Sequence, residues 1–174
     1  MLILSVCIAV SSCGADVSAL ENLCFAVEDF DLERAEKYAC DDEGYFAGVK
    51  ALADRLDAEK TEITKAIYSQ MAFSGFAENG GVCTLTVKYV DIERLKSDVS
   101  FRINTGATAT DALREITESK GFAAQYIKTA ENVTVTLFND GGKAYVPLGY
   151  ASVNAEFTKI LGLDTFLSWY TLQI

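Results

Sequence analysis

The stretch QMAFSGFAENGGVCTLTVKYV, residues 70–90, decides the fold more than any other part of the chain. In its second half Cys83, Leu85 and Val87 alternate with threonines, which is the period-two pattern of a half-buried strand rich in β-branched residues. A weaker apolar run precedes it, and the residues between the two runs, ENGG at positions 78–81, tolerate the positive φ angles of a hairpin turn. The stretch therefore predicts a β-hairpin.

A second hairpin is predicted nearer the C-terminus. Val133, Val135 and Leu137 alternate with threonines, and residues 139–142, NDGG, form a turn before the apolar run of residues 143–148. Helical patterns lie before, between and after the two hairpins. We therefore predict the α+β class, with N-terminal helices packed on a curved antiparallel sheet built from two hairpins and a helical insertion between them.

Several helix ends can be located from capping signals. Ser18 with Glu21, and Thr108 with Asp111, have the spacing of capping boxes, and Asp31 is placed to cap a short helix that follows it. Apolar residues at helical spacing occupy residues 20–27, 45–56 and 113–127, while residues 99–103 suit either a helix or an extended segment. A last helix is predicted to stop at Gly162, and the apolar residues 166–170 beyond it are predicted to be buried.

Composition limits the possible functions. The 174 residues carry a formal net charge of −10, which works against nucleic acid or an anionic membrane surface as a partner. The chain has no histidine, so it lacks the commonest general base and the commonest transition-metal ligand. The acidic residues between positions 29 and 43 lack the ligand spacing of a calcium loop and are interpreted as a solvated surface. We predict no metal and no cofactor.

The N-terminal residues 1–13, MLILSVCIAVSSC, resemble the signal peptide of a bacterial lipoprotein. The apolar segment is too short to span a bilayer, which needs about 20 residues, and it ends in an aliphatic residue, two serines and Cys13. No Lys or Arg precedes it, so we expect a start upstream of Met1 or a trimmed chain. The resemblance implies lipid attachment at Cys13, export, and anchoring on the extracytoplasmic face of a membrane, with residues 14–174 as a single domain. The alternative is a buried N-terminal strand with a core cysteine.

The order of elements resembles the small bacterial lipoproteins that contain a nuclear-transport-factor-two-like domain, a cone-shaped, cystatin-like α+β fold. The resemblance is carried by residues 84–91, TLTVKYVD, by residues 133–135, VTV, and by residues 140–143, DGGK, and it extends over residues 16–162. The family usually has Trp after the Gly-Lys of the last turn, where this chain has Ala144 and Tyr145. The resemblance implies a domain able to hold a ligand, and in some members an isomerase or dehydratase that uses a carboxylate and a tyrosine.

The remaining cysteines suggest structural roles. Cys24 and Cys40 lie on or beside neighbouring helices, so they form either a disulfide or two buried thiols. Cys83 alternates with Leu85 and Val87, which places it in the core. A nucleophilic cysteine would need an activating base, and no histidine is present to serve.

The function predicted from these observations is a non-catalytic, membrane-tethered domain that binds an envelope ligand or protein. We expect its pocket between the curved sheet and the helices, with Phe73, Tyr89 and Tyr145 in the lining. Two alternatives remain: a structural accessory protein of the envelope, or a small pocket enzyme. The enzyme would draw on tyrosines with an aspartate, and the candidates are Tyr68, Tyr89, Tyr126 and Tyr145 with Asp54 or Asp91.

Overall fold

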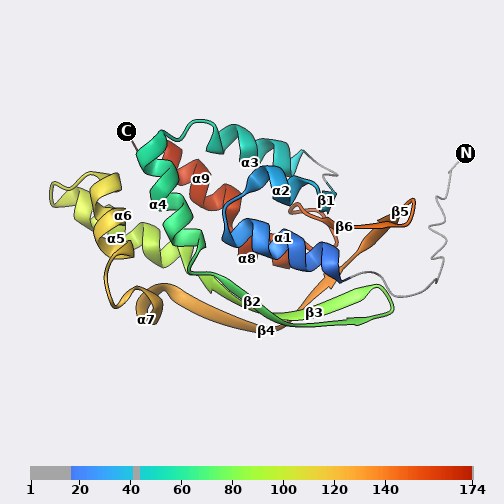
Figure 1. Cartoon of the computed structure of the whole chain (residues 1–174). Helices are drawn as coiled ribbons and strands as arrows, with labels where there is room; N and C mark the ends of the chain where they lie inside the picture. Colours follow the sequence, from blue (N-terminus) through green and yellow to red (C-terminus); the bar gives the residue numbers. More distant parts are fainter. Residues whose placement is uncertain (1–16, 41–43, 174) are drawn as a thin grey trace, which may run out of the picture.

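The computed structural model describes residues 17–40 and 44–173 (Figure 1). The predicted signal peptide and the lipid attachment site at Cys13 therefore lie outside the described residues. The helices are α1 Ser18–Glu28, α2 Leu32–Glu36, α3 Tyr45–Ala53, α4 Ala58–Tyr68, α5 Ile92–Asn104, α6 Ala109–Thr117, α7 Phe122–Tyr126, α8 Ala155–Leu161 and α9 Leu163–Thr171. The strands are β1 Ala39–Cys40, β2 Ala72–Asn79, β3 Val82–Val90, β4 Ile127–Thr136, β5 Phe138–Asp140 and β6 Lys143–Pro147.

The first predicted hairpin is confirmed. Strands β2 and β3 pair antiparallel, and Gly80 and Gly81 turn the chain with φ of 63° and 86°, angles that favour glycine. Along β3 the side chains of Cys83, Leu85 and Val87 are buried, as the alternation predicts. The hairpin is therefore half-buried, with one face in the core.

Strand β4 extends this sheet on the other side of β3, giving the order β2-β3-β4. The helical pattern predicted to run to Ile127 is wrong at its end, because α7 stops at Tyr126 and β4 begins at Ile127. Tertiary pairing explains the difference: β4 aligns with β3 from Val90 opposite Ile127 to Val82 opposite Thr136. A long antiparallel ladder satisfies backbone groups that a short helix end would leave unpaired.

The α+β class is confirmed, but a single sheet built from two hairpins is not what forms. The turn at Gly141 and Gly142 is present, yet the strand that faces β6 across it is β5, not the strand containing Val133 and Val135. Strand β6 also pairs in parallel with β1, so a second sheet has the order β1-β6-β5.

The chain leaves the first sheet just after Thr136. The side chain of Asn154 binds both backbone groups of Thr136. Its Oδ1 accepts from the Thr136 N–H at 2.8 Å, and its Nδ2 donates to the Thr136 carbonyl at 2.9 Å. The next residue, Leu137, donates its backbone N–H to Gly81 at 3.1 Å, and β5 begins directly afterwards. These hydrogen bonds separate β4 from β5 and divide the strands between two sheets.

Helices cover one face of the β2-β3-β4 sheet, as Figure 1 shows for α1, α8 and α9. The space between helices and sheet is filled by one continuous hydrophobic cluster. Its largest fully buried side chains include Tyr68, Phe46, Phe157, Phe166 and Tyr170. The apolar C-terminal segment is buried as predicted, in α9, and Gly162 ends α8 with φ of 60°. A Cβ at Gly162 would displace the terminal methyl of Ile92, and the positive φ favours glycine there in any case.

Two of the three helix starts predicted from capping side chains are capped as expected. Asp31 Oδ1 accepts from the Arg34 N–H at 2.9 Å, and the pair Thr108 and Asp111 caps α6. The prediction of a capping box at Ser18 is wrong. The cap position of α1 is Val17, whose backbone is already helical, and Ser18 is the first residue of the helix. Within the described part of the chain, no helix is long and apolar enough to cross a membrane.

Residue Asp91 joins β3, α5 and β4. Its side chain accepts from the Arg94 N–H at 3.2 Å, capping α5, and from Lys128 Nζ at 2.6 Å. Burial favours the neutral acid, but the hydrogen bonds from Lys128 and from the Arg94 N–H outweigh it, so the pKa of Asp91 lies below its ordinary value. Asp91 therefore stabilises the junction as a charged carboxylate.

Substitution of Val87 should test the register of the sheet. Val87→Asp places an unpaired carboxylate at a fully buried position, and we expect it to lower the free energy of unfolding by about 3 kcal/mol or more. Thr86→Asp, at a half-buried position on the other face, should cost less than about half of that. Urea denaturation measures both variants, and equal small losses would contradict the observed register.

Substitution of Asp91 should separate the cap from the ion pair. Asp91→Ala removes both and should cost about 1 kcal/mol or more, whereas Asp91→Asn keeps a good capping side chain and should cost less. A lowered pKa in the folded state contributes stability that is complete above the ordinary aspartate pKa, about 4, and is lost as the pH falls through the folded value. Thermal unfolding between pH 2 and pH 6 should therefore show a smaller acid loss for Asp91→Asn; an unchanged pH profile would contradict this role.

Candidate functional site

The predicted pocket residues do not come together. Phe73 is buried on β2 opposite Val87, and Tyr89 is half-buried on β3 opposite Lys128. Tyr145 lies on β6 in the other sheet. The interior between sheet and helices is filled by core side chains, and the two cavities described below are lined by other residues.

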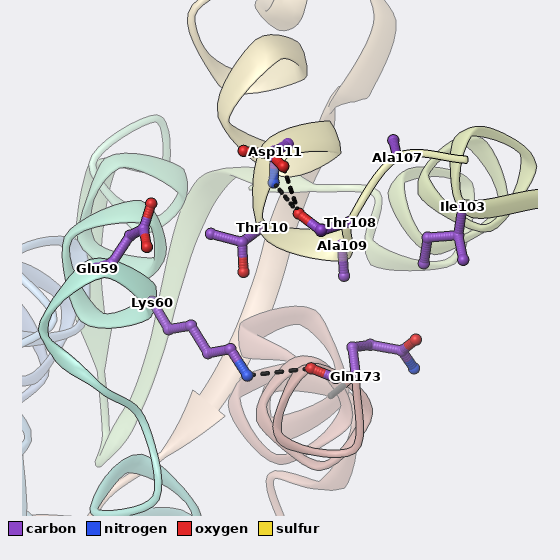
Figure 2. A pocket seen from close by; sticks show the side chains of 9 residues that line it. All are labelled: Glu59, Lys60, Ile103, Ala107, Thr108, Ala109, Thr110, Asp111 and Gln173. Carbon is purple, nitrogen blue, oxygen red and sulfur yellow. Dashed lines mark hydrogen bonds between the residues drawn. The ribbon is translucent and has the colours of Figure 1, made fainter. Parts of the chain in front are cut away.

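The larger cavity lies at the edge of the helical layer and has a volume of about 540 Å³ (Figure 2). It is formed where the first turn of α4, the end of α5, the first turn of α6 and the chain after α9 meet. Its lining residues are Glu59, Lys60, Ile103, Ala107, Thr108, Ala109, Thr110, Asp111 and Gln173. This size falls within the range of about 300–1,000 Å³ that is usual for small-molecule sites.

Capping side chains determine where the two helices that line the cavity, α4 and α6, begin. Asp57 Oδ1 accepts from the Lys60 N–H at 2.8 Å, which starts α4 and sets Glu59 and Lys60 in its first turn. On the other side Thr108 Oγ1 accepts from the Asp111 N–H at 3.0 Å and donates to the Asp111 carboxylate at 2.6 Å. The positions of these side chains are therefore determined by well-defined first turns.

Lys60 is the cation of the cavity. Figure 2 shows its side chain extending toward the chain after α9, where its ammonium donates to the Gln173 carbonyl at 3.0 Å. The ammonium also lies 5.5 Å from the centroid of the Tyr170 ring. Within residues 17–40 and 44–173, Lys60 makes no ion pair with a carboxylate. Among the described residues, the ammonium of Lys60 is thus contacted by a neutral carbonyl and an aromatic ring.

The two carboxylates of the cavity are already engaged. Glu59 forms an ion pair with Arg114 of α6, and Asp111 pairs with the same guanidinium at 3.1 Å. Arg114 also borders a smaller cavity of about 220 Å³ between α4 and α6, with Ile63 and Ala66 on its apolar side.

The tyrosine and aspartate set proposed for an enzyme is not assembled. Tyr126 donates to Asp98 at 2.6 Å, a carboxylate outside the predicted set, and burial followed by this hydrogen bond raises the pKa of Tyr126 to about 12. Asp91 forms an ion pair with Lys128, and Asp54 is the C-cap residue of α3. The hydroxyl of Tyr68 is buried and has no hydrogen-bond partner among the described residues.

Cys24 and Cys40, both in the described part of the chain, are not joined by a disulfide, so the prediction of a bridge is not supported. Cys24 is fully buried on the core face of α1, where it packs as a small apolar side chain. Burial, with Glu21 and Glu28 nearby, raises the pKa of the Cys24 thiol. Cys83 is buried as predicted, and burial raises its pKa as well. Neither thiol has the electropositive surroundings of a reactive cysteine.

The acidic residues of α2 are accounted for by ion pairs. Lys50 of α3 contacts Glu33 at 2.7 Å and Glu36 at 2.8 Å, and Arg34 contacts Asp29 at 3.5 Å. In the portion of the chain that the structure describes, no group of three or more Cys, Asp or Glu residues is arranged to hold a metal ion. This acidic surface ties α2 to its neighbours.

Comparisons of the chain with protein-family models, with curated proteins and with solved structures find no match. The resemblance to lipoproteins with a nuclear-transport-factor-two-like domain therefore stays a prediction. The cavity residues Lys60, Thr110 and Gln173 were not identified from the sequence. The capping signal at Thr108 located one wall, but nothing in the sequence indicated that α4 and the chain end would face it.

Proposed function

We propose that this protein is a non-catalytic binding domain, tethered by lipid at Cys13 to the extracytoplasmic face of a membrane, and that the larger cavity, lined by Lys60, binds its ligand. The observation that carries the proposal is the charge arrangement of the cavity. Its lysine lacks a carboxylate partner among the described residues, while both of its carboxylates are held by Arg114.

Binding is favoured over turnover because the groups that an acid–base mechanism needs are committed elsewhere. The chain contains no histidine, and Glu59 and Asp111 both form ion pairs with the same guanidinium, that of Arg114. Tyr170 donates its hydroxyl to Thr110 at 3.4 Å, so it too acts in positioning. These contacts hold the cavity in one shape, and such preorganisation lowers the cost of binding.

The lining selects the ligand by charge and size. An acidic group, a carboxylate or a phosphate, can contact Lys60 and the hydroxyl of Thr110, while Ile103, Ala107 and Ala109 offer a small apolar wall. We propose an envelope-derived or environmental metabolite with one anionic group and a short apolar portion. The tether would keep the domain close to the membrane, where such a ligand is captured without turnover.

The anchor should depend on Cys13. Expressed with a complete signal peptide, the protein should fractionate with membranes, and Cys13→Ala should move it to the soluble fraction, because two acyl chains are needed for stable attachment. Cys7→Ala, a second cysteine of the same segment, is the matched control and should leave fractionation unchanged. Wild-type levels of Cys13→Ala in the membrane fraction would remove the lipoprotein proposal.

Ligand binding should depend on Lys60. In a thermal-shift screen of small carboxylates and phosphates, we expect a stabilising compound whose effect disappears in Lys60→Met, since a ligand that binds only the folded state raises its stability. Lys65→Met is the control, because Lys65 lies on the same helix, pairs with Glu62 and is absent from the cavity lining. A compound that stabilises both variants equally binds elsewhere. Reproducible turnover abolished by a change at Asp111 or Glu59 would replace the proposal with an enzyme.

A further inference from the structure

A second group of polar side chains lies at the opposite end of α9 from the cavity. Asp164, in the first turn of α9, accepts hydrogen bonds from Tyr150 at 2.7 Å and 2.8 Å to its two oxygens. The hydroxyl of Tyr45, at the start of α3, lies 3.4 Å from the same carboxylate. Three separate segments therefore converge on one acidic side chain.

Asp164 has no cationic partner among the described residues, whereas most carboxylates of this structure with a close polar contact also reach a lysine or an arginine. A carboxylate offers about four acceptor positions. The two tyrosines occupy part of this capacity, and the negative charge itself stays uncompensated by any described residue. Tyr150 is 46% exposed, so the group can be reached from solvent.

The two tyrosines whose hydroxyls reach this carboxylate also place their rings close to each other. The rings of Tyr45 and Tyr150 are nearly perpendicular, at 83°, with centroids 6.1 Å apart. Perpendicular aromatic rings beside a negative charge are the arrangement that attracts an organic ammonium ion, because the ring faces carry partial negative charge. A hard metal ion is less suitable, since it would need several more oxygen ligands.

The buried hydroxyl of Tyr68 is a further polar group behind this carboxylate. It has no hydrogen-bond partner among the described residues. Burial raises the pKa of Tyr68 most, and the nearby charge of Asp164 raises it further, as does Tyr150. The hydroxyl is therefore close enough to Asp164 to sense its charge.

We propose that Asp164, Tyr45 and Tyr150 form a binding site for an alkylammonium group, with the cation held against the carboxylate and the two ring faces. The ligand class is an organic amine or quaternary ammonium compound. This site is distinct from the cavity at Lys60, shares none of its lining residues, and has the opposite charge preference.

Titration with tetramethylammonium chloride, against sodium chloride at the same ionic strength, tests the site in the full chain by NMR. We expect saturable shifts in the tyrosine ring signals of the wild type. Asp164→Asn should weaken binding about tenfold or more, the equivalent of about 1.4 kcal/mol. Tyr150→Leu should abolish binding because the ring is lost, and Tyr150→Phe, which keeps the ring, should retain most of it.

The control variant is Asp140→Asn, which makes the same charge change in the exposed turn before β6 and should bind like the wild type. Tyr150 is largely exposed and Asp164→Asn is nearly isosteric, so the variants are expected to fold, and circular dichroism checks this. Shifts that do not saturate in the wild type, or binding as tight as wild type by Asp164→Asn or by Tyr150→Leu, would overturn the site. Neither result would bear on the cavity at Lys60, because its test uses different residues and anionic compounds.

Discussion

The burial of Phe166 is the packing interaction on which the rest of the structure depends. Its ring contacts Tyr68 of α4 edge-on at a centroid distance of 6.1 Å, and Tyr68 in turn stacks on Phe30 at 5.4 Å. On its other side Phe166 contacts Tyr170 at 5.4 Å within α9. This aromatic row joins the loop after α1, helix α4 and helix α9. Aromatic side chains bury large areas and add about 0.5–1.5 kcal/mol for each such pair, so the row holds α9 in the centre of the helical layer.

The two proposed sites lie beside this aromatic row, one at each end of helix α9. At the C-terminal end of α9, Tyr170 lies under Lys60 and donates to Thr110, so the ring that packs in the core also supports the cavity wall. At the N-terminal end, Asp164 precedes Phe166 by two residues and lies near the hydroxyl of Tyr68. A carboxylate is favoured in the first turn of a helix because it faces the positive end of the helix dipole. A cation supplied by α4 therefore lies beside one end of α9, and an anion of α9 itself lies at the other end.

The polar groups of the helical layer are used in two different ways. Around α2 and at Asp91, carboxylates meet lysine or arginine and join neighbouring elements. The lysines of these pairs are accessible to solvent, which screens the attraction, so the pairs orient elements more than they stabilise the fold. At Lys60 and at Asp164 a charge is held by neutral groups instead, a carbonyl in one case and tyrosine hydroxyls in the other. Charges arranged in this way retain the capacity to attract a ligand of opposite sign.

The sequence alone determined the features that depend on neighbouring residues. Glycines placed the hairpin turn at Gly80 and Gly81, alternation identified the buried face of β3, and capping side chains located the starts of α2 and α6. Tertiary structure decided what depends on residues distant in the chain. Because β4 pairs with β3, Ile127 lies in a strand and not in the predicted helix. The hydrogen bonds between Asn154 and Thr136 lie where the chain passes from the first sheet to the second. The two sites belong to this second kind, because Lys60 meets Gln173 and Tyr45 meets Asp164 across 113 and 119 positions of sequence. Local patterns carry no information about such meetings, which are set by how the buried faces of the helices pack together.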